Sequence, residues 1–102
     1  SWNRKQKKNF QDVFQSHMEN AIVGWFLHFP TNGFLDEMDY WKNSISCGTV
    51  TCFSLTDNNR IIIDGEENTL HTGEGLSFNL KYLHSVPKTD TARDWACLMQ
   101  LI

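Results

Sequence analysis

The chain of 102 residues has few cysteines, few prolines and no long apolar run. Its three cysteines, Cys47, Cys52 and Cys97, are an odd number without CxxC spacing, which leaves no support for a disulfide framework or a zinc knuckle. We therefore expect reduced thiols in a cytoplasmic protein. No apolar segment approaches the roughly 20 residues of a membrane-spanning helix, so no membrane association is expected. The sequence also lacks a nucleophile elbow, a phosphate loop and a dinucleotide fingerprint, which argues against hydrolases, kinases and dehydrogenases.

The charges are distributed unevenly along the chain. Nine basic and twelve acidic residues give a formal net charge of −3, yet Arg4, Lys5, Lys7 and Lys8 place four cations in the first eight residues. The other five basic residues are opposed by all twelve acidic ones, so most of the chain would repel phosphate, and nucleic acid is not expected as a partner. The basic leader is either a solvated first helical turn or a frayed terminus, or it contacts an anionic partner.

The length and the 40% hydrophobic content indicate one small domain with a single core. Phe10, Val13, Phe14 and Met18 recur at the period of one helical face, and Asn9 is a suitable N-cap. This pattern predicts an amphipathic helix near residues 9–19. We expect residues 1–20 to form the basic leader and this helix, and residues 21–102 to form the core.

After Asn20 the sequence changes to short β-prone segments separated by turn residues. The first, residues 21–29, is rich in β-branched and aromatic side chains and is followed by Pro30-Thr31-Asn32-Gly33. Further strands are predicted near residues 34–40, 48–55, 60–64, 68–71, 75–79, 82–87 and 95–101. Seven or eight short strands at this spacing favour a β-sandwich or barrel over a parallel α/β sheet.

The most distinctive motifs are Gly73-Glu74, Phe78-Asn79, His84-Ser85-Val86 and Arg93. They resemble the C-terminal half of a double-stranded β-helix, and more narrowly the aspartyl/asparaginyl β-hydroxylase branch of the Fe(II)/2-oxoglutarate oxygenases. In that branch a GExxxFN strand pattern leads to HSV and then to an Arg. The resemblance covers roughly residues 24–102 and implies a mainly β, jelly-roll or cupin-like double-stranded β-helix with one N-terminal amphipathic helix.

The resemblance also implies a metal centre. Non-haem iron oxygenases bind iron through two His and one carboxylate, and the family's Arg binds the distal carboxylate of 2-oxoglutarate. These roles fall on Asp39, His84 and Arg93. The first His of the family's HxD pair is missing, and Glu37 stands there, two residues before Asp39. Either Glu37 is a third ligand, which would favour harder cations such as Mn²⁺ or Mg²⁺, or it is a surface carboxylate and no iron binds.

Other polar residues have two interpretations each. Thr49 and Thr51 alternate along one predicted strand, where they are either cavity groups that bind a cosubstrate carboxylate or ordinary strand formers. His28 would replace the missing ligand if the strand register differed, and is otherwise a partly buried His. We expect His17 to face solvent and His71 to lie on a loop.

Two functions follow from these observations. The first is an oxygenase that uses Fe(II) and the small-molecule cosubstrate 2-oxoglutarate to hydroxylate an unidentified substrate. The second is a non-catalytic double-stranded β-helix module that binds a ligand or partner and has lost the iron site through the His-to-Glu37 difference.

Overall fold

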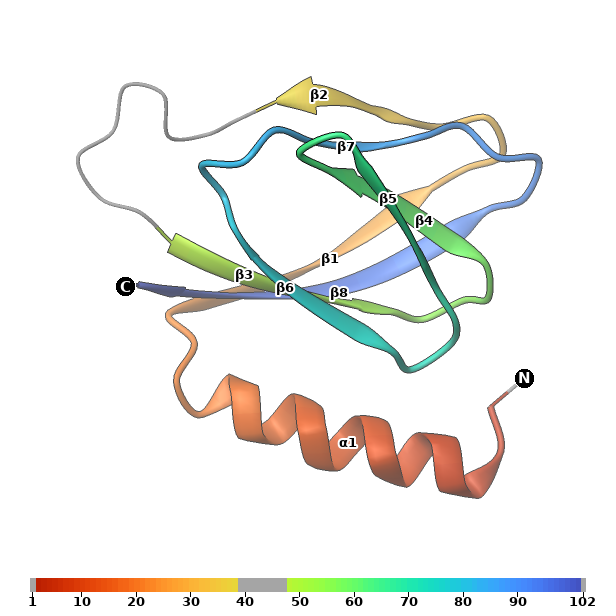
Figure 1. Cartoon of the computed structure of the whole chain (residues 1–102). Helices are drawn as coiled ribbons and strands as arrows, with labels where there is room; N and C mark the ends of the chain where they lie inside the picture. Colours follow the sequence, from red (N-terminus) through yellow and green to blue (C-terminus); the bar gives the residue numbers. More distant parts are fainter. Residues whose placement is uncertain (1, 39–47, 102) are drawn as a thin grey trace.

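The computed structural model describes residues 2–38 and 48–101. One helix, α1 (Arg4–Met18), precedes a set of short strands (Figure 1). The strands are β1 (Val23–Phe29), β2 (Leu35–Met38), β3 (Gly48–Ser54), β4 (Asn59–Ile63), β5 (Glu66–Leu70), β6 (Gly75–Asn79), β7 (His84–Val86) and β8 (Arg93–Leu101). These bounds confirm the predicted succession of strands to within a few residues.

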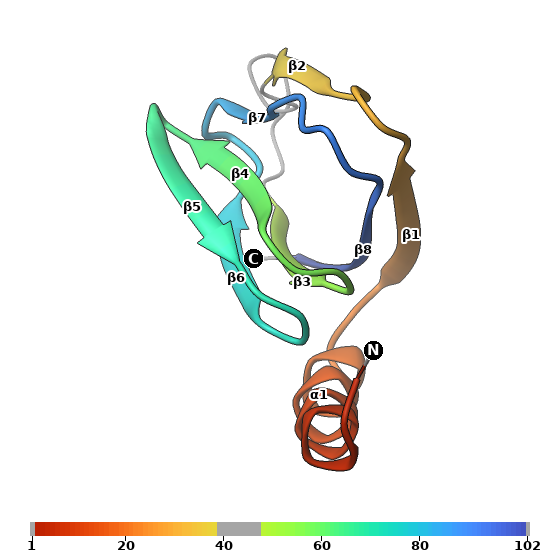
Figure 2. The same cartoon turned by 90° about the vertical axis from the view of Figure 1, so that its right-hand side faces the viewer.

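The strands form two four-stranded antiparallel sheets, with orders β1-β8-β3-β6 and β2-β7-β4-β5. Strands distant in sequence are therefore neighbours, and the last strand, β8, lies between β1 and β3. Viewed from the side, the two sheets enclose a common interior while α1 lies outside it, below the β1-β8-β3-β6 sheet (Figure 2).

The alternation of side chains along the central strand β8 separates two hydrophobic clusters. Trp95 and Cys97 face the interior between the sheets and belong to the main core. Ala96 and Leu98 face the opposite way and form a second cluster with Phe53 of β3, against which α1 packs. The fold thus uses both faces of one sheet, one for the interior and one for the helix.

The helix begins earlier than the sequence predicted. The Asn3 side chain accepts a hydrogen bond from the backbone N–H of Gln6, and the Gln6 side chain accepts one from the Asn3 N–H, which completes a capping box. The prediction of Asn9 as N-cap is therefore wrong, and the basic leader forms the first turns of α1. Phe10 and Phe14 pack on Phe53, as the helical period predicted. Within the described part of the chain, no helix is long and apolar enough to cross a membrane.

Candidate functional site

The interior between the two sheets contains a cavity of about 530 Å³. This volume lies within the range of roughly 300–1,000 Å³ that is typical of small-molecule sites. Strands of both sheets line it, and most of the lining side chains are aromatic or aliphatic, among them Trp25, Phe29, Val50, Phe78, Val86 and Met99. Several of these side chains, Phe29 and Phe78 among them, also belong to the main hydrophobic core, so the core and the cavity share their walls.

His84 is a buried polar residue of the cavity wall. It lies on β7, is 5% exposed, and its ring centre is 5.2 Å from that of Phe78. Its Nδ1 lies 2.8 Å from the carbonyl oxygen of Tyr82. Because a carbonyl only accepts, Nδ1 carries the proton and donates, which fixes the orientation of the ring. His84 is thus a preoriented polar group in the wall of an apolar cavity.

Trp95 is a second cavity-lining residue that carries a polar atom. Its indole is 2% exposed and lines the cavity from β8. The Nε1–H is buried and has no hydrogen-bond acceptor among the residues that the structure describes. A buried donor without an acceptor is costly, by about 1–3 kcal/mol.

The third polar feature is a pair of thiols. Cys52 of β3 and Cys97 of β8 are directly opposite in the antiparallel ladder, and both line the cavity. Their sulfur atoms are 3.5 Å apart. The pKa of Cys52 is raised well above its ordinary value. The main cause is the hydrogen bond with the Cys97 thiol, and burial is the second. These two cysteines are free thiols. They are 45 positions apart in the sequence, so their proximity follows only from the pairing of β3 with β8.

The predicted iron ligands are not assembled in the described part of the chain. His84 faces the cavity, whereas Glu37 is exposed on β2, whose register with β7 shifts between Leu35 and Met38. Asp39 lies outside the described residues. Among residues 2–38 and 48–101, no three His, Cys, Asp or Glu side chains are grouped so as to bind a metal, and no carboxylate lines the cavity. Of the predicted ligands, the described residues bring His84 alone to the cavity wall.

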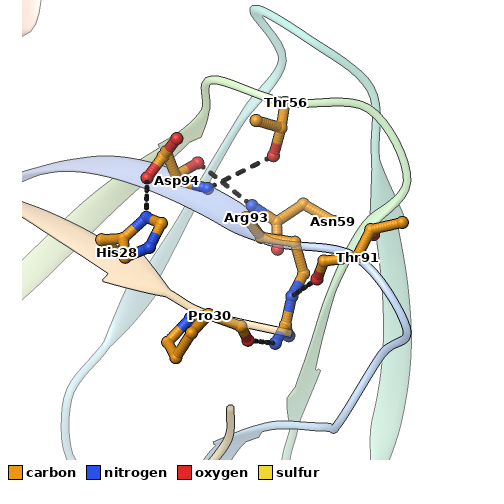
Figure 3. A network of polar contacts seen from close by, with 7 residues as sticks. All are labelled: His28, Pro30, Thr56, Asn59, Thr91, Arg93 and Asp94. Carbon is orange, nitrogen blue, oxygen red and sulfur yellow. Dashed lines mark hydrogen bonds and ion pairs between the residues drawn. The ribbon is translucent and has the colours of Figure 1, made fainter. Parts of the chain in front are cut away.

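Arg93, predicted to bind 2-oxoglutarate, is fully buried at the start of β8 and makes backbone contacts. Its Nε donates to the carbonyl oxygen of Thr91 at 3.1 Å, and its Nη1 donates to that of Pro87 at 2.8 Å. Its Nη2 donates to the carbonyl oxygen of Gly33 at 2.6 Å. The same nitrogen donates to that of Pro30 at 3.4 Å (Figure 3). The guanidinium thus joins the β1–β2 turn to the loop before β8, and Arg93 is not among the residues that line the cavity.

The two threonines predicted to face the cavity lie on the other face of β3. Val50 and Cys52 line the cavity. Because successive side chains of a strand point to opposite faces, Thr49 and Thr51 point away from it. The Thr51 hydroxyl is 2.6 Å from that of Ser77 on β6. The prediction that these two hydroxyls line the cavity is therefore wrong. The alternation along the strand was correct, but the face that meets the cavity is the opposite one, and a one-residue change of phase moves every side chain to the other face.

An exposed polar pair lies at one end of β1 and β8. His28 and Asp94 are register partners, and His28 Nδ1 is 2.7 Å from the Asp94 carboxylate (Figure 3). The backbone of Asp94 donates to the Thr56 hydroxyl and accepts from the Asn59 side chain. His28 is among the cavity-lining residues, but its side chain is 63% exposed. We interpret this pair as a surface contact between the two paired strands β1 and β8.

Comparison with known proteins identifies the fold. No family model and no curated protein matches the chain. Among solved structures, it is similar to a predicted oxalate decarboxylase from Thermotoga maritima (11% identity, 86% of this chain and 73% of that one, TM-score 0.64). It is also similar to a Cupin_2 domain of an XRE family transcriptional regulator from Enterobacter cloacae. The identity is 14%, the match covers 76% of this chain and 78% of that one, and the TM-score is 0.62. A DMSP lyase from Ruegeria pomeroyi matches at 11% identity, over 79% of this chain and 39% of that one, with a TM-score of 0.65.

At such low identities the likeness shows the fold alone. The similar structures include enzymes and a domain of a transcriptional regulator, so they leave the function open. The two antiparallel sheets, the N-terminal helix and these similarities confirm the predicted fold class. The chain has a mainly β, cupin-like double-stranded β-helix fold.

Proposed function

We propose that this chain is a binding module that takes one small, largely apolar molecule into the cavity between its two sheets. The single observation that carries this proposal is the cavity of about 530 Å³ with mostly aromatic and aliphatic walls. Burial of apolar ligand surface contributes about 25 cal/mol per Å², so such walls favour an uncharged, hydrophobic occupant.

The polar groups of the cavity define one further property of the ligand. The buried indole N–H of Trp95 needs an acceptor, and the His84 ring is held by its Nδ1 contact to Tyr82. The proposed ligand therefore carries a carbonyl, ether or hydroxyl oxygen that accepts from Trp95. A ligand carboxylate is disfavoured, because Arg93 donates to backbone carbonyls outside the cavity wall. We further propose a reducing, cytoplasmic setting, as the three cysteines predicted.

The test is a fluorescence titration with phenylnaphthylamine, a neutral apolar dye that brightens in apolar surroundings. We expect saturable binding of one dye per chain. Val50→Phe adds a ring to the cavity wall from β3 and should weaken binding at least about tenfold, while Thr49→Val, on the other face of the same strand, should leave it unchanged. Absence of saturable binding to the folded parent would refute the proposal, as would equal binding by both variants.

The Fe(II)/2-oxoglutarate oxygenase is the second candidate. One observation favours it: His84, the residue that the family motif assigns to the metal, is buried in the cavity wall of a cupin-like fold. It requires Asp39 beside His84, and Asp39 lies outside the described residues. Anaerobic titration with Fe(II) and 2-oxoglutarate tests it. Metal-dependent binding of 2-oxoglutarate that is lost in Asp39→Ala would favour the oxygenase over the binding module.

A further inference from the structure

The two thiols in the cavity wall have the geometry from which a disulfide forms with little movement. Residues directly opposite in an antiparallel pair have Cα atoms roughly 4.5–5.5 Å apart, within the 4.4–6.8 Å that disulfides span. Cys52 and Cys97 are such a pair, with their sulfur atoms at 3.5 Å. A disulfide requires about 2.05 Å, so the sulfur atoms need to approach by only about 1.5 Å.

The cavity supplies the route by which an oxidant reaches them. Cys52 and Cys97 are 8% and 2% exposed, so neither is open to a bulky disulfide such as oxidised glutathione. Both line the cavity, whose volume of about 530 Å³ admits a small uncharged oxidant readily. The raised pKa of Cys52 keeps this thiol protonated, so the pair rests as a dithiol, and because the thiolate is the species that reacts with peroxide, Cys52 itself reacts slowly.

We propose that Cys52 and Cys97 are a reversible redox modification site, converted to a cross-strand disulfide by a hydroperoxide that enters through the cavity. One thiol is oxidised by the peroxide to a sulfenic acid, which breaks the O–O bond and releases one water. The second sulfur attacks the sulfenic sulfur, the S–S bond forms, and a second water leaves. Two thiols and one hydrogen peroxide thus give one disulfide and two waters, and a dithiol reductant reverses the change.

The cross-link joins β3 to β8, the two adjacent strands at the centre of one sheet. It closes a loop of about 46 residues, a length for which the chain-entropy model gives a large stabilisation of the folded state. For a domain of this size, we expect the melting temperature to rise by about 10 °C or more. An occupied cavity should exclude the oxidant, and this one consequence rests on the proposed function.

The experiment uses the full chain carrying Cys47→Ser, which removes the third thiol. The reduced protein is treated with hydrogen peroxide and examined by intact mass, by non-reducing peptide mapping and by thermal melting. We expect the loss of two hydrogen atoms, a peptide that links positions 52 and 97, and a melting temperature that falls back after dithiothreitol. In the Cys47→Ser background, a further Cys52→Ala or Cys97→Ala substitution leaves one thiol of the pair. Each should abolish the linked peptide and the reversible shift in melting temperature.

Three results would overturn the proposal. The first is a folded, peroxide-treated protein that keeps both thiols. The second is a protein that carries only sulfinic and sulfonic acids at these positions. A linked product that melts no higher than the reduced protein would also contradict it, because such a link would not fit the native strands.

Phenylnaphthylamine tests the route. At about ten times its Kd, the dye should slow disulfide formation about tenfold, because only about a tenth of the cavities are then empty. An unchanged rate at that occupancy would refute entry through the cavity. If the dye does not bind the reduced protein, the proposed function fails, whereas the mass and melting results still decide whether the disulfide forms.

Discussion

Replacement of Arg93 by Met removes a buried guanidinium that joins two loops. Its three shortest hydrogen bonds, at 2.6–3.1 Å, go to the backbone carbonyls of Gly33, Pro87 and Thr91. At roughly 1.5 kcal/mol for each bond from a charged donor, their sum is about 4.5 kcal/mol. Burial, with a smaller contribution from Arg60, lowers the pKa of Arg93, so the desolvation cost of the cation offsets part of this sum. We expect a net loss of about 3 kcal/mol in the free energy of unfolding.

Urea denaturation followed by tryptophan fluorescence measures this loss, which corresponds to a melting temperature lower by about 15 °C. Arg93→Lys keeps the charge but not the planar fork, so we expect an intermediate loss. Arg60→Met is the matched control: its ion pair with Glu67, at 3.0 Å, is partly exposed and should contribute less than about 1 kcal/mol. A loss below about 1 kcal/mol in Arg93→Met would refute the role of Arg93 as the residue that joins the loops.

Three further substitutions test the local structure. Asn3→Ala removes the helix cap and should cost about 1 kcal/mol in urea unfolding, whereas no measurable loss would contradict the capping box. Asp57 accepts hydrogen bonds from the Thr72 backbone and hydroxyl, which lower its pKa; its stabilisation is therefore present above the unfolded pKa and disappears as pH falls through the folded pKa. Asp57→Asn should flatten the acid side of the stability profile, and an unaltered profile would refute this assignment. Gly75→Ala places a Cβ 2.7 Å from the buried Phe53 ring and should cost about 1–3 kcal/mol, which a thermal melt would show and an unchanged midpoint would contradict.

The sequence predicted the strands well because their boundaries depend on local features. Pro30 to Gly33 form a turn in which the Gly33 N–H donates to the Pro30 carbonyl, and Asn32 adopts a positive φ of 64°, as such turn residues readily do. The helix boundary was missed because the Asn3 cap precedes the first apolar residue of the helical face by several positions.

The site was less predictable because it depends on strand phase and on contacts between distant residues. The alternation of Thr49 and Thr51 is visible in the sequence, but nothing local states which face of the strand meets the cavity. The Arg93 guanidinium donates to backbone carbonyls. Because every residue has such a carbonyl, the sequence does not indicate which residues are its partners. Cys52 and Cys97 become neighbours only through the pairing of β3 with β8.

The most direct test of the proposed function is the indole N–H signal of Trp95 in a proton–nitrogen NMR titration with octanol, a neutral apolar molecule with an acceptor oxygen. We predict a saturable downfield shift of the Trp95 signal, because the bound oxygen supplies the acceptor that the described residues lack. The indole of Trp2, which already donates to the Leu55 carbonyl at 3.1 Å outside the cavity, is the internal control and should not move. A Trp95 signal that stays in place, or that shifts in parallel with Trp2 without saturation, would contradict binding in the cavity.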